Sequence, residues 1–163
     1  MPAARRQAPF DRQGDRPMKV REIMSINAVR IFSGATMAEA AELAAMSNAS
    51  GLFVVDEENN FIGVLSEGDM MAMVLPEMSE VMERGGNFRD SYGILAEKGA
   101  RLANEAIDTH LIADPLTLDP NDEILKAAST MAMKKMRRLP VVKNGKLVGM
   151  VSRGDICKAV LKG

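Results

Sequence analysis

The sequence predicts a mixed α/β fold built from two pseudo-symmetric copies of one β-α-β-β-α unit, and three recurrences support this prediction. The run GVLSEGD at 63–69 returns as GMVSRGD at 149–155, an offset of 86 residues. The apolar run LFVV at 52–55 returns as LPVV at 139–142, an offset of 87. The pair Ala40-Ala41 matches Ala127-Ala128 at the same offset of 87. Self-similarity at a nearly fixed offset is the signature of a repeated structural unit.

The first copy follows this order of elements along the chain. Thr36 followed by Glu39 forms a capping-box pattern, which marks the start of a helix with apolar residues at a spacing of three and four. An apolar strand, a turn over 56–60 and a second strand come next. The expected elements are an extended segment, a helix, two strands and a final helix, at 28–32, from 36, at 52–55, at 61–65 and from 68.

The second copy repeats the order with one residue less in its turn. Leu116–Leu118 is the extended segment, and Asp119-Pro120-Asn121-Asp122 supplies the turn and the acidic start of the helix. Asn144-Gly145 lies between the two strands and is the strongest short signal for a hairpin. Neither copy of about 55 residues offers enough apolar surface for a robust core alone, so we expect the two copies to pack together.

Two segments lie outside the repeats. Residues 1–17 contain four arginines with Pro, Gln and Gly, and we expect a disordered arm there. The expected division is therefore this arm, a first repeat at 18–75, a helical linker at 76–106 and a second repeat at 107–163. The linker shows helical spacing on both sides of Gly85-Gly86. It is either a connector packed on the repeats or an added surface for a dimer or partner.

Composition excludes several classes of function. The net charge is -1, which argues against bulk attraction to nucleic acid or to an anionic membrane. No apolar run reaches the roughly 20 residues that span a bilayer, and no signal core is present, so we expect a cytoplasmic protein. His110 and Cys157 are the only His and Cys, so no ordinary metal site and no catalytic triad can be assembled. We expect Cys157 to be a core residue and the protein not to be an enzyme.

The repeated motif places the same polar groups at two strand-to-helix junctions. Ser66 and Ser152 stand where the N–H groups of a following helix point at an anion. Asp69 and Asp155 lie in the first turn, where a carboxylate can accept hydrogen bonds from two ribose hydroxyls. The alternative is that Ser and Asp only cap the helix, which is a common use of these residues. The duplication favours a ligand site in at least one copy.

These paired motifs resemble a tandem cystathionine-β-synthase (CBS) domain pair, also called a Bateman module, over about 20–75 and 107–162. The resemblance implies repeats packed sheet to sheet and an adenine nucleotide (AMP, ADP, ATP or a related adenosyl ligand) in the cleft between them. It implies a regulatory, energy-sensing module, commonly a homodimer, that acts on a separate protein. No cofactor is required, and nothing indicates membrane or nucleic-acid binding.

Family sites combine the Ser/Asp turn of one copy with the first strand and the Leu-Pro-Val-Val approach of the other. By position, the Asp69 site would contain Ser66, Gly68, Asp69, Thr117, Met136, Arg137, Arg138 and Pro140. The Asp155 site would contain Val29, Ala49, Ser50, Gly51, Phe53, Ser152, Arg153, Gly154 and Asp155.

Charge separates the two copies. Every charged residue from 37 to 70 is acidic, and every charged residue from 124 to 154 is basic. These can be solvated, mutually attractive faces, or Arg137 and Arg138 can hold phosphates at the Asp69 site. With only Arg153 expected near Asp155, the second interpretation predicts tighter binding of phosphorylated ligand at the Asp69 site.

A second hypothesis is a ligand-free interaction module that uses the basic face and the linker helices. The sequence leaves open the phosphate count, the number of occupied sites and the regulated partner.

Overall fold

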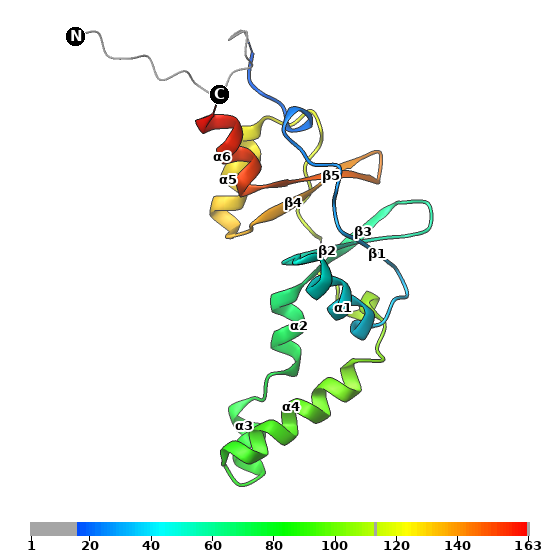
Figure 1. The fold of residues 1–163 in the computed structure, drawn as a ribbon, viewed down its shortest axis with the longest axis vertical. Helices are drawn as coiled ribbons and strands as arrows, with labels where there is room; N and C mark the ends of the chain where they lie inside the picture. The colour runs from blue at the N-terminus through cyan, green and yellow to red at the C-terminus, as the bar shows by residue number, and fades with distance from the viewer. Residues whose placement is uncertain (1–15, 113, 163) are drawn as a thin grey trace, which may run out of the picture. The chain divides into compact units, whose positions relative to one another are not determined.

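The computed structural model describes residues 16–112 and 114–162 (Figure 1). The first copy contains β1 (Arg30–Phe32), α1 (Met37–Ser47), β2 (Gly51–Val55), β3 (Phe61–Ser66) and α2 (Glu67–Val74). The linker contains α3 (Met78–Glu83) and α4 (Phe88–Leu102). The second copy contains α5 (Ile124–Lys134), β4 (Arg138–Lys143), β5 (Lys146–Ser152) and α6 (Arg153–Leu161). Short 3₁₀ helices, Val20–Glu22 and Ile107–His110, lie at the start of the two copies. The mixed α/β class is confirmed.

The chain divides into two compact units, which we describe separately. The central unit is Val29–Pro115, and the terminal unit is made of the described residues within Met1–Ala28 and Leu116–Gly163. The central unit contains a sheet in the order β1-β2-β3, with β1 parallel to β2 and β2 antiparallel to β3. Its core lies between this sheet and α1, and its fully buried members are Ala40, Leu52, Val54, Leu65 and Ile107.

The expected start of α1 is confirmed. The Glu39 amide donates to Thr36 Oγ1 over 3.2 Å, and the Thr36 amide donates to the Glu39 carboxylate over 2.7 Å. These reciprocal bonds satisfy two of the donors that a helix start leaves unpaired. Asn48 ends α1 in the left-handed region at φ 51°, a conformation that Asn tolerates better than most residues.

The terminal unit is built around the antiparallel pair β4-β5. Asn144 and Gly145 have φ values of 50° and 76°, so the predicted hairpin turn is confirmed in the conformation that Asn-Gly favours. The extended segment before α5 is shorter than expected. Only Leu118 pairs with β4, through a parallel bridge to Val141, because Pro120 follows at once and has no N–H to continue a ladder.

The leading segment of each copy packs in the unit of the other copy. The amides and carbonyls of Ser25 and Met150 exchange hydrogen bonds of 2.9 and 2.8 Å, which ties the start of the first copy to β5. In the central unit, the Ile112 amide donates to Val64 O of β3 over 3.2 Å. Equivalent segments, 86 to 87 residues apart, therefore make equivalent contacts with the strand that carries the repeated motif.

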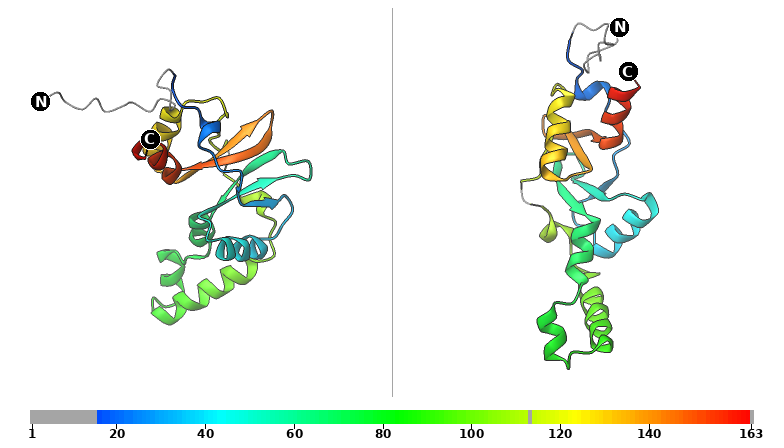
Figure 2. Two further views of the ribbon diagram at one scale, coloured as in Figure 1. Left: turned by 45° about the horizontal axis from the view of Figure 1, so that its top comes forward. Right: turned by 90° about the vertical axis from the view of Figure 1, so that its left-hand side faces the viewer.

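The linker helices α3 and α4 lie side by side and stand away from the β1–β3 sheet of the same unit (Figures 1 and 2). They flank Gly85 and Gly86, whose φ values are 116° and 73°. Glycine adopts such values at little steric cost, so this pair allows the chain to reverse between two helices.

Three further observations bear on the sequence predictions. Cys157 is exposed on α6, so its assignment to the core is wrong; its neighbours Asp155 and Ile156 are the half-buried residues of that turn. Residues 1–15 of the expected N-terminal arm lie outside the described residues. Within the described residues, no helix has the length and apolar character needed to cross a membrane.

Candidate functional site

The first-copy turn joins β3 to α2 through Ser66 and Asp69. Ser66 keeps an extended backbone at φ -91° and ψ 146°, and is the N-cap of α2. Its Oγ accepts the Asp69 amide over 2.9 Å and donates to Asp69 Oδ2 over 2.5 Å. The capping function of these residues is therefore present, and it leaves Asp69 half-buried in the first turn of the helix.

The second-copy turn repeats this arrangement with one more bond. Ser152 Oγ accepts the Asp155 amide over 3.1 Å and donates to Asp155 Oδ2 over 2.7 Å. The Ser152 amide also donates to Asp155 Oδ2, over 2.7 Å, which completes a capping box. The Asp155 carboxylate is therefore held more firmly by its own helix start than the Asp69 carboxylate.

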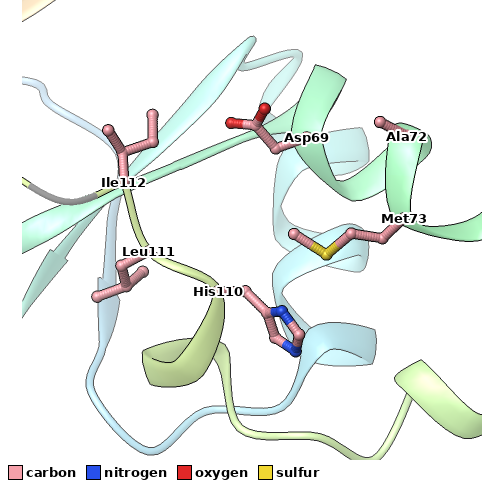
Figure 3. Close-up of a pocket in the computed structure, with 6 residues that line it drawn as sticks. All are labelled: Asp69, Ala72, Met73, His110, Leu111 and Ile112. Carbon is pink, nitrogen blue, oxygen red and sulfur yellow. The ribbon is translucent and has the colours of Figure 1, made fainter.

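A hollow of about 450 Å³ opens beside Asp69 in the central unit (Figure 3). Asp69 and Met73 project from α2 toward the segment 110–112 on the opposite side of the hollow. Most of its lining side chains are apolar, and its two titratable groups are a carboxylate and an imidazole. The lining residues are Asp69, Ala72, Met73, His110, Leu111 and Ile112.

Sequence reasoning missed the wall of this hollow formed by His110, Leu111 and Ile112. The repeat offset held the signal, because Leu111 is the counterpart of Met24 at 87 residues. Both residues approach the motif glycine of a strand. A Cβ on Gly63 would lie 3.2 Å from Leu111 Cδ1, and one on Gly149 would lie 3.3 Å from Met24 Sδ. The glycines therefore make room for the leading segments, as expected of close backbone approach.

Polar contacts of two side chains, Asp108 and His110, hold that wall against the rest of the central unit. Asp108 accepts hydrogen bonds from Ser33 Oγ over 2.5 Å and from the Gly34 amide over 2.7 Å. These donors stabilise the charged form and keep the pKa of Asp108 below its ordinary value. His110 Nε2 lies 2.7 Å from Glu105 Oε2. The imidazole is thus oriented by a carboxylate at the edge of the hollow.

The central unit contains parts of both predicted sites. Ser66, Gly68 and Asp69 lie there, with Ser50 and Gly51 of the other predicted set beside them. The Glu67 amide donates to Ser50 O over 3.2 Å, and Gly51 pairs with Ser66 across the sheet. Val29, Ala49 and Phe53 of that set also belong to this unit.

Two of these residues place their side chains in the interior. Ala49 is 1% exposed and Phe53 is 3% exposed, and the Phe53 ring makes an edge contact with Phe61 at 6.5 Å. Their side chains belong to the packing of the unit, so a ligand would meet the backbone at these positions.

The terminal unit contains the other residues of both predicted sites, which are Thr117, Met136, Arg137, Arg138 and Pro140 together with Ser152–Asp155. Arg138 pairs directly with Ser152 across β4 and β5, so their side chains share one face of the sheet. Arg137 O accepts the Arg153 amide over 3.1 Å. The premise that Arg153 is the one basic residue near Asp155 is therefore wrong, because strand pairing brings Arg137 and Arg138 to the same turn.

The Arg153 side chain binds the C-terminal end of α5. Its Nε donates to Met136 O over 2.8 Å and its Nη2 reaches Met131 O at 3.4 Å. These carbonyls lie in the last turn of α5 and just beyond its end, where a guanidinium complements the helix dipole. Among the described residues, no three His, Cys, Asp or Glu side chains gather in a way that could hold a metal ion.

Comparison with known proteins identifies the class. The family profile of the CBS domain matches residues 20–76 and 107–162, so the chain belongs to the CBS-domain family as a tandem pair. It is 30% identical over 139 residues to the uncharacterized protein MJ1225 of Methanocaldococcus jannaschii, covering 85% of this chain and 41% of MJ1225. It is 27% identical over 140 residues to the chloroplastic CBSX1 of Arabidopsis thaliana, covering 78% and 56%. The chain thus spans about half the length of these relatives.

Solved structures agree on the fold. CBSX2 of Arabidopsis thaliana, solved with AMP, matches with a TM-score of 0.67 and 23% identity over 88% of this chain and 96% of that one. The CBS pair of MJ0100, solved with 5′-methylthioadenosine and S-adenosyl-L-methionine, matches with a TM-score of 0.61 and 18% identity, covering 88% and 95%.

Proposed function

We propose that this protein is a regulatory CBS pair that binds an adenine nucleotide or related adenosyl compound at its Ser/Asp turns and signals the bound state to a partner protein. The observation that carries the proposal is the capped Ser66–Asp69 turn facing a largely apolar hollow of about 450 Å³. Such a volume is in the range of small-molecule sites. Two structural neighbours of the same fold were solved with adenosine compounds.

In this proposal, different residues around the hollow contact the ribose and the base of the ligand. Asp69 supplies carboxylate oxygens that accept hydrogen bonds from ribose hydroxyls. Such charge-assisted hydrogen bonds are shorter and stronger than those between neutral groups. Met73 and Leu111 supply apolar surface for a base, and His110 adds a polar group at the rim. Apolar walls with few placed polar groups are typical of cofactor sites. The hollow is thus suited to the nucleoside part of the ligand.

The phosphates of the proposed ligand need cations that the hollow lacks, apart from the imidazole of His110. Arg137 and Arg138 meet this need in the composite site expected from the family pattern, because guanidinium groups match phosphate geometry. Arg153 is excluded from this role in the proposal, since its guanidinium already binds the end of α5. Thr117, Met136 and Pro140 complete the Asp69 site in this proposal. The Asp155 site in this proposal uses Val29, Ser152, Gly154 and Asp155 with the backbone of 49–53.

In this proposal the chain binds a ligand without transforming it, as a cytoplasmic homodimer that requires no cofactor. A ligand changes the module only by as much as its affinity differs between two conformations. The competing function is a ligand-free interaction module. One observation favours it specifically: the Ser and Asp side chains of both turns already serve as caps of their own helices.

A thermal-shift series separates the two functions. The full chain is heated with adenosine, AMP, ATP and S-adenosyl-L-methionine, with GMP as the matched control for the base, since it shares the ribose and phosphate of AMP. A ligand at 100 times its dissociation constant stabilises the folded state by about 2.7 kcal/mol, which gives a clear rise in Tm. A rise with an adenine compound and none with GMP supports the proposal. Unchanged Tm values with every adenine compound support the interaction module.

A further inference from the structure

The linker hairpin α3–α4 carries large apolar side chains on its outside. Met78 and Met82 are 75% and 65% exposed, and Phe88 and Tyr92 are 78% and 61% exposed. Residues four apart share one face of a helix, so each pair forms a short apolar stripe. The Phe88 and Tyr92 rings touch edge to face at 5.1 Å. Scattered exposed apolar residues are ordinary, whereas large apolar side chains gathered on one hairpin are a feature of interaction sites.

Both stripes have one end beside the tip of the hairpin. Met82 ends one stripe and Phe88 begins the other, and the two flank the Gly85-Gly86 turn. The sulfur of Met82 would lie 3.3 Å from a Cβ on Gly86, so this side chain lies over the turn. We define the hairpin-tip surface as Met78, Met82, Phe88 and Tyr92. It lies in the linker, outside both segments that match the CBS profile.

Two ion pairs neutralise charge within the hairpin. Arg84 Nη2 binds Glu97 over 2.6 Å, and this contact keeps the pKa of Glu97 below its ordinary value. Lys98 Nζ binds Glu80 over 2.6 Å and Leu75 O over 3.1 Å. Residues 76–102 contain five acidic and four basic side chains. A nearly neutral segment with internal ion pairs opposes contact with its own copy only weakly.

We propose that the hairpin-tip surface is a self-association site, at which the α3–α4 hairpins of two copies of this chain pack as a four-helix arrangement. Each of the four side chains offers about 100–170 Å² at these exposures, so two copies would bury about 1,000 Å². That area reaches the threshold for a specific interface, about 1,000 Å², and exceeds most accidental contacts. A two-fold interface uses the same patch on both copies, which suits one uncharged surface.

This proposal does not depend on nucleotide binding. It also predicts a different contact from one formed by the repeats themselves. Met46 on α1 tests the repeat surface, because it is 79% exposed and lies within the first copy. Ile26 serves as the matched control, because it is 70% exposed and lies outside both helical surfaces.

The test is sedimentation equilibrium of the full chain without ligand, for the unsubstituted protein, the double variant Met82→Glu/Phe88→Asp, Met46→Glu and Ile26→Glu. All substituted side chains are mostly exposed, and far-UV circular dichroism verifies that each variant folds. We expect a dimer whose dissociation constant rises at least about 100-fold in the double variant, as expected for the loss of central apolar anchors. Met46→Glu and Ile26→Glu should leave it unchanged.

A monomeric unsubstituted protein at tens of micromolar would overturn the proposal. So would a dimer that the double variant leaves intact, or one that Met46→Glu disrupts while the double variant does not. Disulfide capture gives an independent readout. In a Cys157→Ser background, Tyr92→Cys should yield a cross-linked dimer on oxidation, whereas Arg101→Cys at the far end of α4 should not.

Discussion

The two Ser/Asp turns have nearly the same sequence, but their surroundings differ. At Ser152–Asp155 three hydrogen bonds cap the helix, two of them to the Asp155 carboxylate, and the neighbouring Arg153 binds the end of α5. At Ser66–Asp69 the capping is lighter, with two contacts, and the helix faces a hollow. The comparison teaches that one motif can serve mainly as a helix cap in one copy and border an open hollow in the other.

Substitution of the motif glycines, Gly63 and Gly149, should give the largest difference in stability loss between the two copies. A Cβ on Gly149 would lie 2.7 Å from the carbonyl oxygen of Ser25, whereas a Cβ on Gly63 meets the flexible end of Leu111 at 3.2 Å. Backbone yields less readily than a side chain, so Gly149→Ala should cost about 2–3 kcal/mol of stability and Gly63→Ala about 1 kcal/mol or less. Urea unfolding of both variants measures this. Equal losses would contradict the difference in packing.

Arg137 and Arg138 should separate phosphate binding from nucleoside binding. Replacing both with Ala removes charge-assisted bonds of about 1.5–3 kcal/mol each, so the affinity for AMP should fall at least about tenfold. The affinity for adenosine should stay the same, since it has no phosphate. Lys143→Ala, also basic and in the second copy, is the control and should leave both affinities unchanged. Isothermal titration calorimetry with the two ligands measures these affinities. An equal loss of affinity for adenosine and AMP would contradict phosphate binding by Arg137 and Arg138.

Substitutions at position 153 and at its counterpart, position 67, should differ by a smaller amount in their effect on the stability of the protein. Arg153→Ala removes the guanidinium from the carbonyls of Met136 and Met131, at a cost of about 1 kcal/mol. Glu67 is exposed and makes no comparable side-chain cap in the described contacts, so Glu67→Ala should change stability by no more than about 0.5 kcal/mol. Thermal unfolding of the two variants checks this. A larger loss of stability for Glu67→Ala than for Arg153→Ala would contradict the stabilising role assigned to Arg153.

The smallest expected effect is a dependence on pH in the terminal unit. Hydrogen bonds from Arg16 and the Lys19 amide lower the pKa of Glu22 from 4.5 to about 2. Because the folded-state pKa is depressed, the contribution to stability is complete above pH 4.5 and disappears as the pH falls toward 2. The pair is partly exposed, so the effect should be under about 1 kcal/mol.

The measurement is the free energy of unfolding at pH 5 and pH 2.5, for the unsubstituted protein and for Glu22→Gln. The unsubstituted protein should lose more stability on acidification than the variant. Arg16→Ala should behave like Glu22→Gln, and identical pH dependence in all three proteins would show that the contact contributes nothing.

Local sequence patterns predicted the helices and turns of the fold well. The features that they did not predict arise from contacts between segments distant in the chain. The Thr36 capping box and the Asn144-Gly145 turn depend on neighbouring residues, and both were predicted correctly. The wall His110–Ile112 and the cap from Arg153 were missed, because both arise from strands and segments distant in the chain. Cys157 was misplaced because one residue in a short terminal helix can face either way. The repeat offset could have found the wall, since it relates Leu111 to Met24.

Isothermal titration of AMP into the unsubstituted protein, Asp69→Ala and Asp155→Ala tests the central claim most directly, with circular dichroism to verify folding. The account predicts measurable binding that weakens at least about tenfold in Asp69→Ala, and by less in Asp155→Ala, whose carboxylate serves its own helix start. No heat with the unsubstituted protein, or a larger loss in Asp155→Ala, would contradict it.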